Sequence, residues 1–266
     1  SAASDVYKRQ DLNAQQKDIV LSLLGVTESD LDNYEVLQVT NKDEHEYLDD
    51  YLSASVIGTK ALSSVRIEKG EEGKGIHVET KNITYCTSGM YTNALITAGI
   101  TDADVIVAGP FELSGTAALV GAMKAYEAMT GETLSDDRED AATNELVLTS
   151  ELAQSIGSDD AEQLMALVKE KVANGDIKDA EGLQKAVEES ADELGVSLTD
   201  AQKQKLAQLF DKISKLDLDV DKLKQQAENI YNKLQDLGLT VDEAQSWLDK
   251  IVSFFKKIAE TVSSWF

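Results

Sequence analysis

Ala103-Asp-Val-Ile-Val-Ala108 opens the stretch that decides the fold, which continues as Gly109-Pro-Phe-Glu-Leu113 and Ser114-Gly-Thr-Ala-Ala-Leu-Val-Gly-Ala-Met-Lys-Ala-Tyr126. Within the first part, Val105, Ile106 and Val107 form a short apolar run, the pattern of a strand buried on both faces. The single proline, Pro110, beside Gly109 predicts a turn. The last part has small residues at its inner positions, which indicates a helix lying close on a sheet, with Ser114 or Thr116 as its cap. The stretch therefore predicts a strand, a turn and a helix.

Composition excludes several classes of protein. The chain has 266 residues, 42% of them hydrophobic, which is enough for one or two domains with a sizeable core. A net charge of −24 argues against nucleic acid as a partner and favours solubility or cationic partners. One cysteine excludes an internal disulfide framework, and with only two histidines we expect no metal and no cofactor. The sequence contains no apolar run of about 18 residues, the length that predicts a membrane span.

The first ten residues, Ser-Ala-Ala-Ser-Asp-Val-Tyr-Lys-Arg-Gln, resemble a translated sequencing adapter. They back-translate as TCG GCA GCG TCA GAT GTG TAT AAG AGA CAG. We therefore interpret residues 1–10 as an artefactual tail and exclude them from the predicted fold. The alternative is a genuine polar N-terminal tail. On the first interpretation, a signal peptide upstream would have been lost from the sequence.

The next part of the chain mixes helix and strand patterns. Asn13 and Gln16 form a capping-box signature at the start of a predicted helix. A glycine-rich loop over 69–75 suits a hairpin between the two β-rich runs that flank it. The predicted elements are a helix over 11–26, a strand over 34–40, a short helix over 42–52, β-rich runs over 56–68 and 76–84, and a helix over 87–99. With the stretch quoted above, they predict an α+β domain over residues 11–132.

From about residue 135 the β-branched runs disappear, and the pattern becomes that of solvated helices. Thr199 and Gln202 form another capping-box signature. From Leu206 to Trp265, apolar residues recur at alternating steps of three and four, which is the spacing of a helix–helix seam. Internal stop signals, such as the one at Gly238, favour several packed helices over one rod. We expect a small mixed sheet with packed helices, followed by an all-α region over 133–266.

One candidate binding site lies in the stretch that decides the fold. Ser114, Gly115 and Thr116 follow a buried strand and open a helix, where free N–H groups bind anions. The alternative is that these residues only cap the helix and allow tight packing. An enzyme is a competing hypothesis, in which Ser114 or Thr116 acts in a hydrolase-like site and His45 or His77 is the partner. The surrounding Leu-Ser-Gly sequence does not match the hydrolase pattern, and we assign no catalytic residue.

Other chemistry-bearing residues have simpler interpretations. We expect His77 to face solvent from a strand, His45 to lie on the surface and Cys86 to be a partly buried small hydrophobe. Asp217, Asp219, Asp221 and Glu228 match a calcium-loop template, although Lys222 stands where glycine is needed. Helix capping is the alternative, and we assign no metal site.

Residues 248–266 combine lysines with a wide apolar face, which suits a membrane interface. Packing against the protein's own helices or against a second copy is the alternative. The residues of this candidate membrane or partner contact are Phe254, Phe255, Ile258, Val262, Trp265 and Phe266.

Three further segments carry a family resemblance. They are Gly75-Ile-His-Val-Glu-Thr-Lys-Asn-Ile-Thr84, Met90-Tyr-Thr-Asn-Ala-Leu-Ile-Thr-Ala-Gly99 and Asp104-Val-Ile-Val-Ala-Gly-Pro-Phe-Glu-Leu-Ser-Gly-Thr-Ala-Ala-Leu119. With shorter matches at 147–152 and 212–216, the chain resembles the YpuA-like proteins of Gram-positive bacteria, domain-of-unknown-function family one-thousand-and-two, over residues 11–266. The resemblance implies an extracytoplasmic protein made with a signal peptide. It implies no reaction and no catalytic residues.

From these observations we expect an uncharacterised secreted or cell-envelope protein that acts as a non-enzymatic binding or interaction module. A hydrolase-like enzyme or an anion-binding site at the Ser114 turn is one alternative. A membrane-surface protein anchored through residues 248–266, or self-associating through its C-terminal helices, is another.

Overall fold

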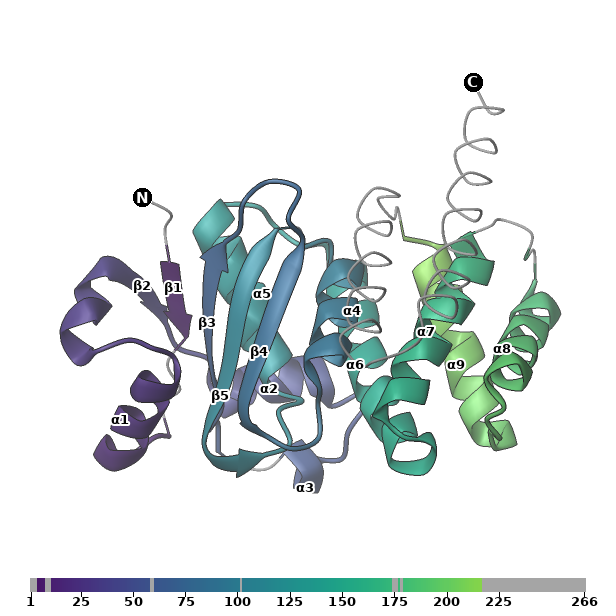
Figure 1. Ribbon diagram of the computed structural model, residues 1–266, viewed down its shortest axis with the longest axis horizontal. Helices are drawn as coiled ribbons and strands as arrows, with labels where there is room; N and C mark the ends of the chain where they lie inside the picture. The colour runs from purple at the N-terminus through teal and green to yellow at the C-terminus, as the bar shows by residue number, and fades with distance from the viewer. Residues whose placement is uncertain are drawn as a thin grey trace, which may run out of the picture. The chain divides into compact units, whose positions relative to one another are not determined.

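The computed structural model describes residues 4–7, 11–57, 60–100, 102–173, 177 and 179–216 (Figure 1). The chain divides into two compact units, the first ending at Val147 and the second beginning at Leu148. The first unit contains a mixed sheet with helices, and the second is helical where it is described. The protein is therefore α+β, as the sequence predicts.

The sheet of the first unit has five strands among the described residues, in the order β2-β1-β3-β5-β4. β5 is antiparallel to β3 and parallel to β4, so the sheet is mixed. The strands are β1 (Ser4–Tyr7), β2 (Tyr34–Leu37), β3 (Ser64–Lys69), β4 (Ile76–Ile83) and β5 (Ala103–Leu113).

β1 belongs to the segment that we excluded from the predicted fold. The structure pairs Ser4–Tyr7 in parallel with β2 and antiparallel with β3. A short extended segment forms ladders through its backbone groups, whatever its side chains are. The exclusion from the sheet was therefore wrong for these four residues, and the proposed origin of residues 1–10 stays a prediction.

The expected hairpin around the glycine-rich loop was wrong. β3 and β4 each pair with β5, which lies between them. The loop crosses the start of β5 and is held there by the Asp102 carboxylate, which accepts hydrogen bonds from the amides of Gly73 (3.0 Å) and Gly75 (2.7 Å). A loop pattern alone does not distinguish neighbouring strands from strands with another strand between them.

The turn expected at Gly109 and Pro110 lies inside β5. The ladder with β3 ends at Ala108, and the register with β4 shifts between Lys81 and Ile83. Pro110 thus stands where neither neighbouring strand requires an N–H donor, and this is where a strand tolerates proline.

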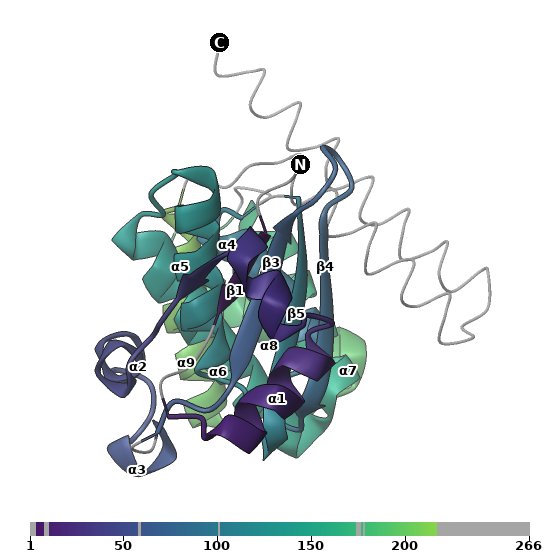
Figure 2. The ribbon, with the colours of Figure 1, turned by 90° about the vertical axis from the view of Figure 1, so that its left-hand side faces the viewer.

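The two faces of β5 have different environments. Val105 and Val107 are buried, and α4 and α5 cover this side of the sheet. On the opposite side, α1 packs over Ala108 and Ile106, while Asp104 is exposed (Figure 2). The predicted burial on both faces is therefore confirmed at Val105 and Val107 but only in part at Ile106, which is half-buried because α1 covers only one end of this face.

The helices of the first unit are α1 (Ala14–Leu23), α2 (Asn41–Leu48), α3 (Ala54–Ile57), α4 (Ser88–Ala98) and α5 (Ala118–Thr130), with a 3-10 helix over Glu28–Asn33. The capping box of Asn13 and Gln16 is confirmed. The predicted start of the β-rich run over 56–68 was wrong, because Val56 lies in α3 and β3 begins only at Ser64.

α5 begins at Ala118, which is three residues later than a cap at Ser114 predicts and one residue later than a cap at Thr116 predicts. Its N-cap is Ala117, which makes no side-chain cap hydrogen bond, so the predicted cap by Ser114 or Thr116 was wrong. The small inner residues of the predicted helix are confirmed as buried, among them Ala118, Gly121, Ala122 and Ala125.

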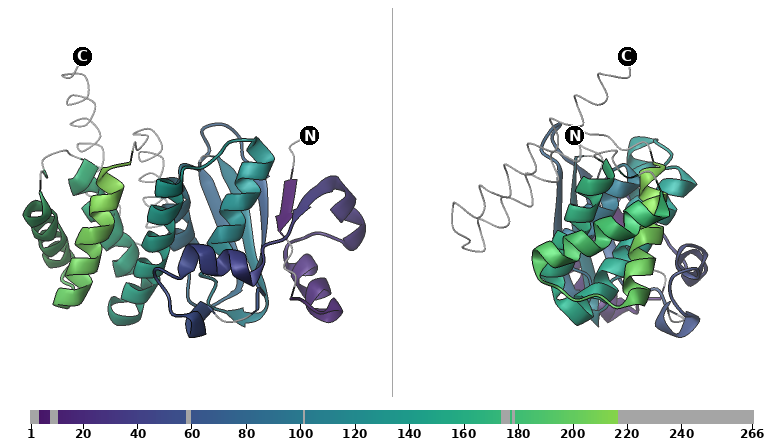
Figure 3. Two further views of the ribbon diagram at one scale, coloured as in Figure 1. Left: turned by 180° about the vertical axis from the view of Figure 1, so that it is seen from behind. Right: turned by 90° about the vertical axis from the view of Figure 1, so that its right-hand side faces the viewer.

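α6 (Asp136–Ile156) begins in the first unit and continues into the second, which also holds α7 (Ser158–Ala173), α8 (Ala180–Leu194) and α9 (Asp200–Ser214). α7, α8 and α9 pack against one another (Figure 3). The capping box at Thr199 is confirmed, and the first seam positions, Leu206, Leu209 and Ile213, are buried. The rest of the seam lies outside the described residues.

Candidate functional site

A pocket of about 320 Å³ lies at the start of α5 and contains the candidate site residues Ser114, Gly115 and Thr116. The end of β5 and the turn that follows it form one wall. Two helices and the segment before β3 form the others. The remaining described residues that line the pocket are Glu44 of α2, Val56 and Ile57 of α3, Lys60, Leu62 and Ser63 before β3, and Leu113 and Ala117 beside the turn.

A hydrogen bond from α4 fixes the turn that forms the pocket wall. The Tyr91 hydroxyl donates a 2.5 Å hydrogen bond to the carbonyl oxygen of Gly115. Gly115 has a φ of +88°, and a Cβ atom there would lie 2.3 Å from the Tyr91 hydroxyl oxygen. The local geometry therefore requires glycine at this position.

Of the three hydroxyl-bearing side chains that line the pocket, Ser114 is exposed, whereas Ser63 and Thr116 are buried. Ser63 is 5% exposed and Thr116 is 6% exposed. Neither side chain forms a hydrogen bond with another described residue. Buried polar side chains in proteins are generally hydrogen-bonded, so two such groups in one pocket are a mark of a binding site.

The pocket also has two charged side chains of opposite sign among its described lining residues. Glu44 is 1% exposed and forms part of the wall, whereas Lys60 is exposed. A buried carboxylate beside the proposed anion site repels a simple anion. The structure thus brings Ser114, Gly115 and Thr116 together in one pocket. It also places the negative charge of Glu44 there, which the hypothesis of an anion site did not include.

The sequence gives little indication of this additional residue. Glu44 stands among acidic neighbours in the segment 42–52, which we predicted as a short helix. Its burial comes from the packing of α2 beside α5, which brings together parts of the chain that are far apart in sequence.

The histidine needed for a Ser114 nucleophile is not supplied by His77. His77 pairs in register with Asp104, near the start of β5, whereas Ser114 follows the end of that strand. At about 3.3 Å per residue, the two positions are separated by roughly 30 Å. His45 lies 2.7 Å from Asp49 within α2 and is not among the residues that line the pocket. Cys86 is buried, as predicted, and its amide donates to the carbonyl oxygen of Ser114 at 3.1 Å.

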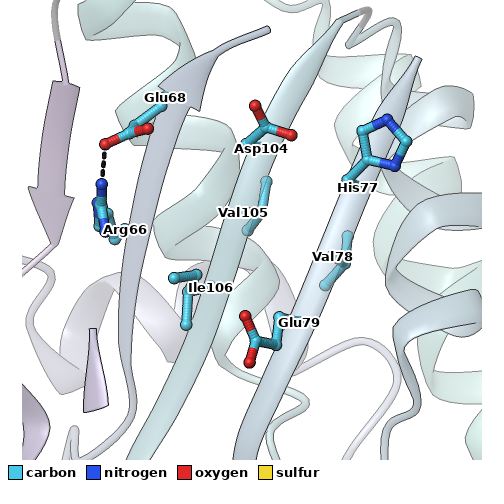
Figure 4. A pocket seen from close by; sticks show the side chains of 8 residues that line it. All are labelled: Arg66, Glu68, His77, Val78, Glu79, Asp104, Val105 and Ile106. Atoms are coloured by element: carbon cyan, nitrogen blue, oxygen red, sulfur yellow. Dashed lines mark hydrogen bonds and ion pairs between the residues drawn. The ribbon is translucent and has the colours of Figure 1, made fainter. Parts of the chain in front are cut away.

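A second, shallower pocket of about 240 Å³ lies on the open face of the sheet (Figure 4). Figure 4 shows side chains from three neighbouring strands, with Glu68, Asp104 and His77 in one row and Arg66, Ile106 and Glu79 in the next. His77 is exposed, which confirms that it faces solvent.

The positive charge of the sheet-face pocket is already used within the protein. Arg66 pairs with Glu68, donates a 2.8 Å hydrogen bond to the Leu24 carbonyl oxygen at the end of α1, and lies 5.8 Å from the centre of the Tyr34 ring. No group of three potential metal ligands occurs among the described residues. Arg66, the base of this face, thus serves to dock α1, so the pocket at α5 is the better candidate.

Two other candidates lie outside the described residues. These are the calcium-loop template over 217–228 and the apolar face of residues 248–266, with Phe254, Phe255, Ile258, Val262, Trp265 and Phe266. Among the helices that are described, none has the length and apolar character needed to cross a bilayer.

The fold and the pocket define an α+β protein with a small polar site between the end of a central strand and the helix that follows it. Residues 10–230 match the model of the family described as "Protein of unknown function (DUF1002)", and the chain belongs to that family. The chain is also similar to the "Uncharacterized protein YpuA" of Bacillus subtilis (strain 168), with 45% identity over 210 residues, covering 79% of this chain and 71% of the relative. No solved structure matches.

Proposed function

We propose that this chain is a non-enzymatic binding protein of the cell envelope and that its ligand site is the pocket at the start of α5. The observation that carries the proposal is the pair of side chains Ser63 and Thr116, which are 5% and 6% exposed and whose hydroxyls form no hydrogen bond with another described residue. Both line the pocket. A ligand in the pocket can therefore form hydrogen bonds with both hydroxyls.

The surroundings of the pocket support binding rather than chemistry. The hydroxyl of Ser114 has no histidine partner in the pocket, and the wall is fixed by the Tyr91–Gly115 hydrogen bond. A rigid wall with few polar groups orients a ligand at low entropic cost. The envelope location is carried over from what the family resemblance implies.

Thermal unfolding of the full chain with three chemically different probes tests the site. The probes are L-leucine, D-glucose and inorganic phosphate, each at millimolar concentration. We expect at least one of them to raise the melting temperature of the wild type, because a ligand that binds only the folded state stabilises it. Thr116→Val keeps the shape of the side chain but removes the hydroxyl, and should abolish the increase.

Thr80→Val on β4 is the matched control, because Thr80 does not line the pocket. This variant should respond to the probe like the wild type. The proposal is contradicted if no probe stabilises the wild type, or if Thr116→Val responds as strongly as Thr80→Val.

The envelope location has a separate test in the genomic sequence upstream of Asp11. An in-frame signal peptide there supports the location. An ordinary start codon directly before the family match contradicts it.

A further inference from the structure

The charge pattern of the α5 pocket restricts the kind of ligand that it accepts. Among the described lining residues, Glu44 is the one acid and Lys60 the one base. A simple anion would meet the buried carboxylate of Glu44, and a simple cation would meet the positive charge of Lys60. A ligand that carries both charges matches both parts of the pocket.

One contact holds the Glu44 side chain, and a second contact holds the helix α2 that carries it. Within α2, the Asn41 side-chain amide donates a 3.3 Å hydrogen bond to the Oε2 atom of Glu44. The neighbouring Asp43 lies 3.1 Å from the Lys124 ammonium group, which ties α2 to α5. The carboxylate is therefore fixed at the pocket wall, close to the start of α5, and does not reorient freely in solvent.

The pocket also provides groups for a carboxylate. The hydroxyls of Ser63 and Thr116 are available as donors, and Lys60 adds a positive charge at the exposed side.

Most of the remaining lining is aliphatic. Val56, Ile57, Leu62 and Leu113 form this part, beside Ser114, Gly115 and Ala117 of the turn. Val56 is 61% exposed, the largest exposed fraction among the large hydrophobic residues whose exposure is described. An apolar ligand group that covers Val56 would remove this surface from water.

We propose that the ligand is a free α-amino acid with an aliphatic side chain, bound with its ammonium group against Glu44 and its carboxylate against Ser63 and Thr116. The pocket, at about 320 Å³, has the volume for a ligand of this size. This inference rests on the proposed function and specifies the ligand of the same site.

Isothermal titration of the full chain with L-leucine and two matched derivatives tests the inference. N-acetyl-leucine lacks the ammonium group, and leucinamide lacks the carboxylate. Because a hydrogen bond to a charged group contributes about 1.5–3 kcal/mol, each derivative should bind the wild type about tenfold or more weakly than leucine. Glu44→Gln should lose the preference for leucine over N-acetyl-leucine, whereas Lys185→Met, on an exposed helix surface of the second unit, should keep it.

The comparison on the wild type remains decisive even if Glu44→Gln does not fold. The inference is overturned if N-acetyl-leucine or leucinamide binds the wild type as tightly as leucine, or if a folded Glu44→Gln variant keeps the preference. Binding of glucose or phosphate without binding of leucine overturns the inference and leaves the proposed function intact. Binding of none of these probes contradicts both.

Discussion

The hydroxyl of Tyr91 donates a 2.5 Å hydrogen bond to the carbonyl oxygen of Gly115, which joins α4 to the turn at the start of α5. Tyr91 is among the largest fully buried side chains. Tyr91→Phe removes this donor, while the Gly115 carbonyl oxygen keeps the 3.1 Å hydrogen bond from the Ala118 amide. We expect a loss of about 0.5–1.5 kcal/mol in the free energy of unfolding, measured by urea denaturation.

Tyr34→Phe is the control for this change. The Tyr34 ring contacts Arg66, but its hydroxyl forms no hydrogen bond with another described residue. This variant should change the free energy of unfolding by less than about 0.5 kcal/mol. Equal effects of the two changes would show that the Tyr91 bond does not stabilise the turn.

Gly115→Ala should destabilise the protein more than Gly131→Ala does. Both glycines have positive φ, +88° and +71°, so both substitutions carry the cost of a left-handed backbone, about 1–2 kcal/mol. Only at Gly115 would the added Cβ also lie 2.3 Å from a buried oxygen, whereas nothing lies within 4 Å of it at Gly131. Chemical denaturation of the two variants checks the order, and the reverse order would contradict the described geometry of the turn.

The Asp102 carboxylate should control the loop that crosses the start of β5. Asp102→Ala removes the acceptor for the amides of Gly73 and Gly75, and we expect faster hydrogen exchange at these two amides. Asp104→Ala, two residues further on an exposed face, should leave their exchange unchanged. Unchanged exchange in both variants would mean that the loop is held by other contacts.

Glu139, near the start of α6, and Glu127 of α5 form a carboxyl pair, which predicts how the stability of the protein depends on pH. Burial, repulsion by Glu127 and a hydrogen bond with Glu127 raise the pKa of Glu139 from 4.5 to about 7, against the lowering effect of a hydrogen bond from Tyr47. Asp136 adds to the repulsion. In the unfolded chain Glu139 ionises near its ordinary pKa, so its neutral form favours the folded state below pH 4.5, and this contribution is lost as the pH rises to about 7.

Glu139→Gln keeps a neutral side chain at every pH. We therefore expect its melting temperature to exceed that of the wild type increasingly as the pH rises from 4.5 to 7, with a constant difference above pH 7. Parallel melting curves over this range, with no change in the difference, would contradict the raised pKa.

Local signals in the sequence predicted much of the fold because they act over a few residues. The capping boxes at Asn13 and Thr199 and the small residues of α5 are such signals, and all were confirmed. The position of β5 between β3 and β4 could not be predicted in this way, because strand order depends on contacts between distant segments. Pro110 was misplaced for the same reason, since its tolerance within β5 depends on where the neighbouring ladders end.

The candidate site was predicted only in part. The pattern of a strand followed by a helix identified Ser114, Gly115 and Thr116, and the structure brings all three to one pocket. Ser63 and Glu44 complete that pocket from remote segments, and neither has a sequence signal that indicates burial. The charge of Glu44 changes the expected ligand from an anion to a zwitterion.

Titration of the ¹⁵N-labelled full chain with L-leucine, followed by NMR chemical-shift mapping, tests the central claim most directly. The account predicts that the largest shifts occur at the amides of Ser63, Thr116 and Ala117, around the pocket at the start of α5. Shifts centred on His77 and Asp104 of the open sheet face, or no shifts at millimolar leucine, would contradict it.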